Sequence, residues 1–246
     1  ATTSMGSLTG DENRGKPYFD HLRGEIDIDE FFYENVRLDP FFVSKYEVTQ
    51  SQWSRWTGAN PSQNTSPRGE STTALYPVET ISWLNCALTA ERLALELPSE
   101  ARWEYACRAG TTSVFPFGDE PEALKGRANV ADRSFLASGR ALEFAADFDD
   151  GFATTAGIGS LDPNQFGLFD MLGNVWEWCS DDHRVASKPT DGDGRRGDPR
   201  ESGEGVIRGG SWSSNPFNCR SANRLNQNVS NTDSDIGVRF VRRLDP

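Results

Sequence analysis

Histidine is scarce in this sequence, because only His21 and His183 occur among its 246 residues. A zinc site made of three histidines is therefore impossible, and an iron site of two histidines and one carboxylate would need both. A Ser-His-Asp triad would have to use one of the two, and both lie in polar, loop-like sequence. The low histidine content argues against all three kinds of centre.

Cysteine is also infrequent, and the four residues Cys86, Cys107, Cys179 and Cys219 form no CxxC pair. Their spacing matches no zinc-binding pattern, so a cysteine metal cage is not expected. Four cysteines allow three complete disulfide pairings, and the spacing alone does not choose among them. Reduced, buried thiols are the alternative, as expected in a reducing compartment.

Long apolar runs and clusters of basic residues are missing as well. No stretch approaches the eighteen or so apolar residues of a membrane-spanning helix, and no signal peptide is recognisable. The first residue is Ala1, so a processed or truncated N-terminus is one interpretation, and the compartment stays open. The formal net charge of −12 argues against a nucleic-acid partner, because nucleic-acid binding needs clustered lysine and arginine.

Glycine, proline and tryptophan, in contrast, are plentiful, with 23, 13 and 7 copies. This composition favours a loop-rich fold with aromatic clusters over a helical bundle. The length is sufficient to bury a sizeable core, and we expect one domain over residues 1–246. We expect it to include a polar N-terminal segment at 1–36 and a second polar segment at 213–235.

Regular structure is predicted mainly in the first half of the chain. Residues 36–43 indicate two strands separated at Pro40. Thr49 is a suitable N-cap for a helix over 50–57, and Ser99 for a short helix that begins at residue 100. Between them, residues 82–95 predict a helix with apolar residues at helical spacing, namely Leu84, Ala87, Leu88, Ala90 and Leu93. The tryptophans of these segments, Trp53, Trp83 and Trp103, are expected in the core.

The stretch 166–178 combines turn-forming residues, a dense apolar run and two carboxylates. It reads FGLFDMLGNVWEW, with Asp170 and Glu177 seven residues apart. Carboxylates in apolar surroundings are usually paired, hydrogen-bonded or bound to a cation. The stretch is therefore either a buried turn whose acids cap backbone amides or part of a cation site.

This stretch resembles the signature motif of the formylglycine-generating enzyme family, also called the sulfatase-modifying factor family. Other segments match that family in order: 46–50 (YEVTQ) with Trp53, 76–78 (YPV), 82–83 (SW), 97–106 (LPSEARWEYA), 208–212 (RGGSW) and 236–239 (IGVR). The match runs from about residue 5 to residue 243. The resemblance implies an irregular α+β fold of the C-type-lectin-like class with little regular secondary structure.

Two calcium sites are implied by the same resemblance. In the first, Asn129 and Asp150 would bind through side-chain oxygens, and Val130 and Phe152 through backbone carbonyls. In the second, Asp170 and Glu177 would bind through their carboxylates. Gly173 and Val175 would bind through their backbone carbonyls. Oxygen ligands of these kinds suit calcium, which can hold a loop that lacks its own core. Residues 111–165, which show little periodicity, are such a loop.

The resemblance also implies a disulfide between Cys107 and Cys219. Such a bridge would close a loop of more than a hundred residues and contribute about 4 to 5 kcal/mol in the chain-entropy model. Two reduced thiols remain the alternative.

Formylglycine-generating enzymes hold Cu(I) between two cysteines shortly after the GGS segment, and this chain departs from that pattern. Ser214 stands where the first cysteine is expected. Cys219 has the spacing of the second, but counting back from residue 236 aligns it with the disulfide cysteine instead. A hydroxyl does not replace a thiolate as a Cu(I) ligand, so copper is not expected. Were the oxidase interpretation correct, Cys219 would bind the metal and Ser211 would contact substrate.

Residues 213–235 are dominated by serine, asparagine, aspartate, threonine and glutamine. Short polar side chains on loops are typical of adaptable binding surfaces. The segment resembles the variable segments of retroelement-diversified proteins with this fold, which display such residues to a ligand. We expect a ligand-binding groove that involves six residues: Trp176, Trp212, Ser214, Asn218, Arg224 and Asp235. A calcium-stabilised loop without any ligand is the alternative.

The sequence thus predicts a calcium-stabilised, monomeric binding domain for a peptide, a protein or another surface ligand, without copper oxidase chemistry. The competing hypothesis is an oxygen-dependent enzyme, either a divergent formylglycine generator or a tailoring oxidase on the same scaffold. The sequence leaves open whether the chain is an enzyme. A third hypothesis is a purely structural module within a larger assembly.

Overall fold

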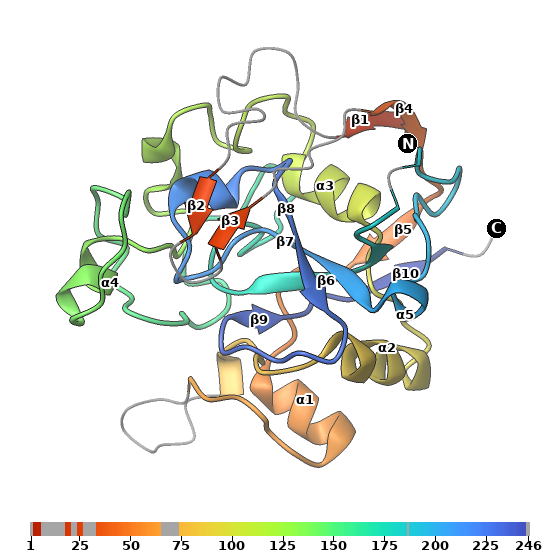
Figure 1. The fold of residues 1–246 in the computed structure, drawn as a ribbon, viewed down its shortest axis with the longest axis horizontal. Helices are drawn as coiled ribbons and strands as arrows, with labels where there is room; N and C mark the ends of the chain where they lie inside the picture. Colours follow the sequence, from red (N-terminus) through yellow and green to blue (C-terminus); the bar gives the residue numbers. More distant parts are fainter. Residues whose placement is uncertain are drawn as a thin grey trace.

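The computed structural model describes residues 2–5, 18–20, 24–26, 33–64, 74–185 and 187–244. Figure 1 shows the arrangement of its elements. The helices are α1 (Gln50–Thr57), α2 (Trp83–Arg92), α3 (Glu100–Arg108), α4 (Arg133–Ala137), α5 (Pro199–Ser202) and the short 3-10 turns η2 (Pro121–Leu124) and η3 (Pro216–Cys219). The strands are β1 (Thr2–Met5), β2 (Tyr18–Asp20), β3 (Gly24–Ile26), β4 (Tyr33–Arg37), β5 (Phe41–Val43), β6 (Trp176–Asp182), β7 (Glu204–Arg208), β8 (Arg224–Asn228), β9 (Ile236–Gly237) and β10 (Val241–Arg243).

A four-stranded sheet in the order β8-β7-β6-β9 organises the C-terminal half of the chain. Strand β7 pairs antiparallel with both neighbours, whereas β9 runs parallel to β6. The pairing places Glu177 opposite Arg208 and beside Gly237. Three segments with family motifs, which are far apart in sequence, therefore lie next to one another in the sheet.

Helices α1 and α3 begin where the predicted caps place them. Thr49 accepts the backbone N–H of Gln52 at the start of α1, and the Gln52 side chain accepts the backbone N–H of Thr49, which completes a capping box. Ser82 and Ser99 also cap α2 and α3 through their side chains. The predicted break at Pro40 is confirmed too, because β4 ends before it and β5 follows it.

The apolar side chains of α2 divide between the core and the surface. Its buried side chains include Trp83, Cys86 and Ala90, whereas Leu84 and Leu88 are 42% and 47% exposed. The apolar spacing identified the helix. Of its five residues, Ala90 belongs to the core and Ala87 and Leu93 pack against it, whereas Leu84 and Leu88 lie at the surface.

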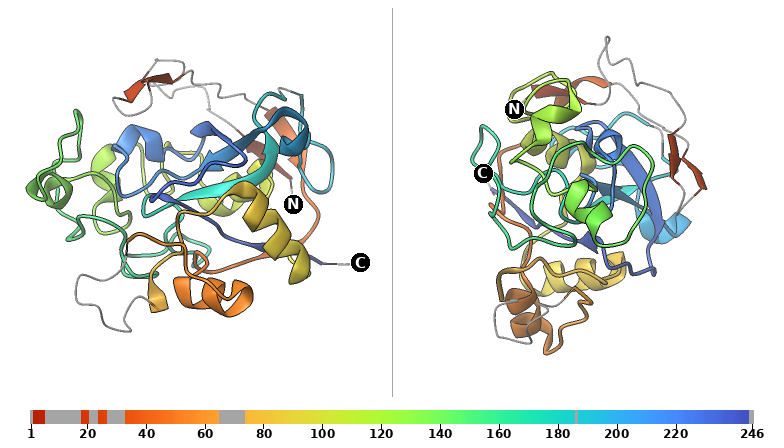
Figure 2. Two further views of the ribbon diagram at one scale, coloured as in Figure 1. Left: turned by 60° about the horizontal axis from the view of Figure 1, so that its bottom comes forward. Right: turned by 90° about the vertical axis from the view of Figure 1, so that its left-hand side faces the viewer.

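Two apolar clusters fill the space on either side of the central sheet. One packs α1 and α2 against the sheet through Trp53, Trp83, Trp176 and Trp178. The other packs α3 and the irregular region on the opposite side, and includes Trp103. Figures 1 and 2 show α1 and α2 on one side of the sheet and α3 on the other. The expectation that Trp53, Trp83 and Trp103 belong to the core is confirmed.

A buried network of charges joins α3 to the sheet. Glu100, which is 0% exposed, binds Arg224 through two nitrogens at 2.7 and 2.8 Å and also pairs with Arg196. Glu104 of the same helix pairs with Arg208 and Arg108. Buried charges are tolerated only when they are paired in this way, so the network fixes the position of α3 on the sheet.

Residues 109–175 form the irregular part of the fold and contain only η2 and α4 as regular elements. This agrees with the weak periodicity of that stretch. Most of the polar segment 1–36, including His21, lies outside the described residues. No helix in the described part of the chain is long and apolar enough to cross a membrane.

Candidate functional site

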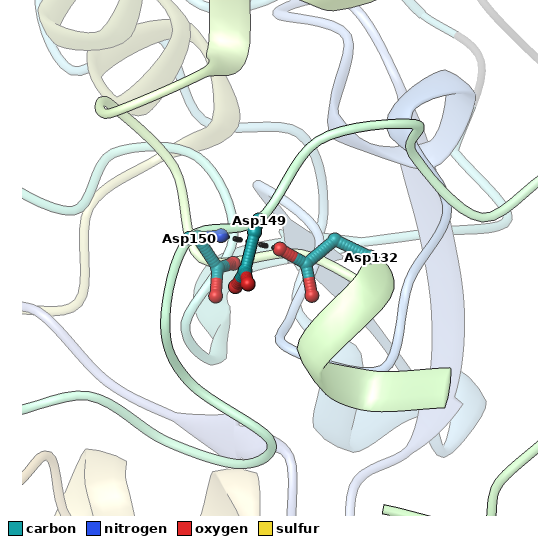
Figure 3. A group of neighbouring side chains, drawn as sticks. All are labelled: Asp132, Asp149 and Asp150. Carbon is teal, nitrogen blue, oxygen red and sulfur yellow. Dashed lines mark hydrogen bonds between the residues drawn. The ribbon is translucent and has the colours of Figure 1, made fainter. Parts of the chain in front are cut away.

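Three aspartates from the irregular region meet beside the start of α4 (Figure 3). One carboxylate oxygen from each of Asp132, Asp149 and Asp150 lies within 4.8 Å of the others. Asp132 is buried, and it accepts the backbone N–H groups of Phe135, at the start of α4, and of Asp150. Clustered carboxylate oxygens are the ligands that calcium prefers, so this group of acids is a candidate cation site.

Asn129 precedes Val130, whose backbone N–H binds Asp150, and its side-chain oxygen has no hydrogen-bond partner among the described residues. The residue is 1% exposed, and its Oδ1 accepts no hydrogen bond from the described residues. Its Nδ2 is occupied, because it donates to the Thr154 carbonyl at 2.9 Å and to Asn174 Oδ1 at 3.1 Å. A buried amide oxygen left unsatisfied costs about 1 to 3 kcal/mol. The donor chemistry therefore fits a calcium ion bound through Asn129 Oδ1.

The loop around Asp150 is held by that residue's own carboxylate. Val130 donates its backbone N–H to Asp150 Oδ2 at 2.9 Å, and Phe152 donates to Oδ1 at 2.8 Å. Burial raises the pKa of Asp150 to about 7, and the nearby carboxylates of Asp132 and Asp149 act in the same direction. A divalent cation would favour the ionised carboxylate and offset both effects. The structure thus brings Val130, Asp150 and Phe152 of the first predicted site together, next to Asn129.

Asn174 connects this region to the signature stretch. Its Oδ1 accepts two hydrogen bonds, one from Asn129 Nδ2 and one from the backbone N–H of Ala156 at 2.8 Å. Its Nδ2 donates to Glu47 Oε2 at 2.6 Å, and its backbone carbonyl accepts the N–H of Trp212 at 2.9 Å. One buried asparagine with φ of +59° therefore links the first predicted calcium site, the second, and the segment that follows the GGS motif.

The second predicted site is only partly assembled as expected. Asp170 is 5% exposed and accepts the backbone N–H of Gly159 at 2.7 Å. Glu177, however, binds Arg239 at 2.9 Å and accepts Trp103 Nε1 at 2.7 Å. Both of its oxygens also contact Arg239 Nε. That Glu177 binds calcium stays a prediction. A calcium ion there would have to share the Glu177 carboxylate with the Arg239 guanidinium.

Glu47 is a buried acid that the sequence analysis did not assign to this site. It accepts Asn174 Nδ2 and, at 3.3 Å, the backbone N–H of Val175. Burial raises its pKa well above the usual range, and the charges of Asp170 and Glu177 raise it further. Burial likewise raises the pKa of Asp170 to about 6. Three buried acids thus face one arginine, and this excess of negative charge would be relieved by a cation.

Serine hydroxyls surround Asp235 where the family's first copper cysteine is expected. Ser211 and Ser213 each donate to Asp235 Oδ2 at 2.8 Å. Ser214 Oγ accepts the backbone N–H of Ser211 at 3.1 Å and lies 3.1 Å from Ser211 Oγ. The structure therefore brings Ser211, Ser214 and Asp235 together in a buried, hydrogen-bonded group.

The thiols do not fit a copper dithiolate site. All four cysteines are free and buried. Burial raises the pKa values of Cys107 and Cys219 to about 12, so neither is a thiolate at neutral pH. Both belong to the same core cluster, where Cys107 lies 3.8 Å from the hydroxyl of Ser221. The disulfide between Cys107 and Cys219 is not formed in this structure and stays a prediction.

All six predicted ligand-facing residues are buried, with at most 7% exposure, and two of them have interior roles. Trp176 is 2% exposed and belongs to the core, and the guanidinium of Arg224 is bound to Glu100. These side chains support the fold beneath the surface and cannot line it. Trp212 packs against Phe135 and lies under the Arg140 guanidinium at 4.9 Å, with 7% exposure.

The segment 213–235 therefore has a buried and an exposed part. Ser214, Asn218 and Asp235 are at most 6% exposed. The side chains that solvent reaches freely are Asn226, Ser230, Asn231, Thr232 and Asp233. Asn226 lies on β8, which is an edge strand of the sheet, and the others follow it.

Sequence reasoning missed four residues of the candidate site: Glu47, Asp132, Asp149 and Asn174. Asp132 carried a local signal, since it precedes a short helix and caps it. Glu47 and Asn174 lie within motifs that match the family, but their mutual contact spans 127 positions and has no local signature.

Comparison with known proteins gives the family. The chain matches the model of the sulfatase-modifying factor enzyme 1-like domain over residues 8–244. The formylglycine-generating enzyme of Mus musculus is 28% identical over 222 residues, which cover 86% of this chain and 57% of that protein. The chain spans about half the length, or less, of the curated relatives it matches.

The fold is shared with two solved structures. PvdO from Pseudomonas aeruginosa superposes with a TM-score of 0.73 at 24% identity, over 99% of this chain and 92% of that one. Treponema denticola variable protein 1 gives a TM-score of 0.69 at 23% identity, over 99% and 95%. The predicted irregular α+β fold of the C-type-lectin-like class is confirmed. With the family model matching nearly the whole chain, the protein belongs to the sulfatase-modifying factor family.

Proposed function

We propose that this chain is a calcium-stabilised ligand-binding member of the family that does not carry out copper oxidase chemistry. One observation carries the proposal. The position expected for the first copper cysteine is Ser214, and its hydroxyl is part of the hydrogen-bonded group around Asp235. Cu(I) prefers soft thiolate ligands, and these hydroxyl and carboxylate oxygens are hard ones.

Cys219 does not compensate for the missing thiol. Its side chain is fully buried, and its pKa of about 12 keeps it protonated at neutral pH. A catalytic or metal-binding cysteine typically lies in an accessible environment that lowers its pKa. The surroundings of Cys219 have the opposite effect, which supports a structural role.

Calcium would act as a structural ion in this proposal. Asn129 supplies an unsatisfied buried oxygen, and the Asp132, Asp149 and Asp150 carboxylates supply negative charge. Asn174 would transmit the order of this region to Trp212, to which it is hydrogen-bonded. Calcium bound here would therefore hold the segment that begins the polar surface.

The ligand would meet the exposed part of residues 213–235. Its side chains are short and polar, as in binding loops that adapt to different partners. These side chains lie on an edge strand and the turn after it, so substitutions there leave the core untouched. A fold shared with Treponema denticola variable protein 1 agrees with the hypothesis of a retroelement-diversified surface. A peptide or a protein is the kind of ligand that we expect.

The proposal is tested by titrating the reduced protein with Cu(I) in competition with a chelator. We expect no binding above background, and we expect the variant Cys219→Ser to behave like the parent protein. Cys179→Ser is the matched control, because Cys179 is an equally buried thiol outside the polar segment. Tight one-to-one binding that Cys219→Ser abolishes and Cys179→Ser retains would overturn the proposal in favour of the oxidase hypothesis.

A further inference from the structure

The guanidinium group of Arg140 rests over two aromatic rings just before the polar segment 213–235. Its central carbon lies 4.9 Å from the ring centroid of Trp212 and 5.6 Å from that of Phe135. The two rings pack against each other, with their centroids 6.0 Å apart. A cation above an aromatic face is attracted by the electrons of the ring. The guanidinium therefore has a preferred position, although Arg140 is an exposed residue.

Hydrogen bonds fix one end of the same guanidinium. Arg140 Nη1 donates to Ser138 Oγ at 2.7 Å and to the backbone carbonyl of Ala153 at 3.1 Å. Both N–H bonds of Nη1 are thus used, whereas Nε and Nη2 donate to no acceptor in the part of the chain that the structure describes. These two nitrogens lie on one edge of the guanidinium. That edge offers two parallel N–H bonds, which match the two oxygens of a carboxylate.

The acids that follow α4 do not occupy this edge. Asp147 pairs with Arg133 at 2.7 Å, and Asp149 accepts a serine hydroxyl of α4 at 2.6 Å. Glu143 is only three residues away from Arg140 in the sequence, but the two form no ion pair. Among the described residues, no carboxylate is paired with Arg140.

The acids of the polar segment are also engaged by other groups, although that segment reaches the ring beneath Arg140. Trp212 Nε1 donates to the carbonyl of Ser234 at 3.5 Å, next to the exposed Asp233. The Asp233 carboxylate accepts the backbone N–H of Ser234 at 2.8 Å, and Asp235 accepts two serine hydroxyls at the same distance. Arg140 therefore adds a positive charge at the margin of the proposed ligand surface without forming an ion pair there.

We propose that Arg140 binds a carboxylate of the ligand through its Nε and Nη2 edge, so that the ligand class of this surface is an acidic peptide segment. One arginine without an acidic partner matches one carboxylate, whereas phosphorylated peptides are typically bound by clusters of arginines. The aromatic rings and the bonds of Nη1 hold the guanidinium in place before the ligand arrives, which lowers the entropic cost of binding.

This inference rests on the proposed function, because it names the class of ligand for the same surface. The formal net charge of the chain is −12, which disfavours an acidic ligand over most of the molecule. A local cation held in a fixed geometry therefore determines where the carboxylate of the ligand lies.

The test uses three short peptides and the indole N–H signals of the isotope-labelled protein in nuclear magnetic resonance. The seven tryptophans give seven such signals, and Trp212→Phe identifies the one that matters. We expect acetyl-glycyl-glutamyl-glycinamide to shift the Trp212 signal saturably, with a dissociation constant in the millimolar range. Acetyl-glycyl-glutaminyl-glycinamide, which has no carboxylate, should bind about fivefold more weakly, as for loss of one exposed charge pair.

The third peptide, acetyl-glycyl-glutaminyl-glycine, carries its carboxylate at the C-terminus. Whichever of the two carboxylate peptides binds more tightly identifies the source of the carboxylate, and either result supports the proposal. The phosphoserine analogue of the glutamyl peptide should bind no more tightly than they do. Tighter binding of that analogue would overturn the assignment to a carboxylate.

Variants separate the shape of the guanidinium from its charge. Arg140→Gln should weaken binding of the glutamyl peptide about fivefold. Arg140→Lys keeps the charge without the two-nitrogen edge and should bind more like Arg140→Gln than like the parent protein. Arg127→Gln is the matched control, because Arg127 also lies over an aromatic ring, that of Phe117 at 5.0 Å, and the net charge changes equally. It should bind the peptide as the parent protein does.

The proposal is overturned if the glutamyl peptide does not saturate or binds no better than the glutaminyl amide. It is also overturned if Arg140→Lys binds as the parent protein does, or if Arg127→Gln loses as much affinity as Arg140→Gln. The copper titration does not involve Arg140, so the two proposals fail separately. Absence of copper binding together with a negative peptide result would remove only the acidic ligand class.

Discussion

Gly173 lies directly against the backbone carbonyl of Asn129. A Cβ atom at Gly173 would overlap the Asn129 carbonyl oxygen, and the same oxygen accepts the backbone N–H of Asn174 at 2.8 Å. Gly173 also has a φ of +74°, which side chains disfavour. The signature stretch and the segment with the first predicted calcium ligands are therefore in contact at a point that only glycine fits.

This contact predicts a large effect for Gly173→Ala. The methyl group would have to push the two backbone segments apart, in addition to the cost of a left-handed alanine, so we expect a loss of about 3 kcal/mol or more in unfolding free energy. Chemical denaturation measures it. Gly167→Ala is the matched control, because Gly167 has the same φ of +74° with nothing near its missing Cβ. Its cost should stay near about 1 to 2 kcal/mol, and equal costs for the two variants would contradict the prediction.

Calcium should stabilise the protein through Asp150. In the parent protein, calcium at about a hundredfold excess over its dissociation constant should add about 2.7 kcal/mol, and a chelator should remove this gain. Asp150→Asn should lose most of the calcium-dependent gain, because a charged ligand becomes a neutral one. Asp147→Asn serves as the control, since the Asp147 side chain is 88% exposed and forms an ion pair with Arg133. A thermal shift with calcium that is identical in both variants would remove Asp150 from the site.

The polar segment should separate into positions that tolerate change and positions that do not. Asn226 and Thr232 are exposed, so replacing either by alanine should change the unfolding free energy by no more than about 0.5 kcal/mol. Arg224 is buried against Glu100, and Arg224→Ala should cost about 3 kcal/mol or more, because it leaves that carboxylate with fewer partners. Urea unfolding of the three variants checks this. A large loss at Asn226 would contradict the division.

Stability should also fall as the pH rises toward neutrality because of Asp181. Asp181 is fully buried beside Glu100, and burial together with the charge of Glu100 raises its pKa to about 7. A group whose pKa is higher in the folded state stabilises the protein at low pH and loses that contribution as pH rises through the folded pKa. The loss from Asp181 therefore falls between about pH 4, near the usual aspartate pKa, and about pH 7.

The measurement is the unfolding free energy from about pH 4 to pH 8, for the parent protein and for Asp181→Asn. The variant is expected to be less stable overall, because both oxygens of Asp181 accept backbone N–H groups from Glu100 and Arg196. The informative quantity is the slope. The difference in stability between the two proteins should shrink as the pH rises, and a constant difference would show that Asp181 does not titrate in this window.

Local sequence was sufficient to predict where helices begin, because a helix start is determined by residues that are neighbours in the chain. The caps Thr49 and Ser99 predict the starts of two helices, because a cap bonds only to the next few residues. Leu84 and Leu88 show the limit of the same reasoning. Their spacing identifies a helix, but which side of that helix meets the sheet depends on distant strands.

The candidate site divides in the same way. Motif matching selected Asn129, Asp150 and Asp170, and the structure places each of them in buried or partly buried polar surroundings. Motif matching could not find the contact between Glu47 and Asn174 or the ion pair between Glu177 and Arg239. These contacts join residues that are 127 and 62 positions apart in the sequence.

The sequence by itself determined the family, the fold class and the absence of a cysteine pair at the copper position. These follow from residue types in a fixed order, which can be read without coordinates. Only the tertiary structure decided which polar residues of 213–235 reach solvent and which, like Arg224, neutralise buried charges. The physical reason is that burial and charge pairing depend on which segments are neighbours in space, and the sheet order β8-β7-β6-β9 establishes those neighbours.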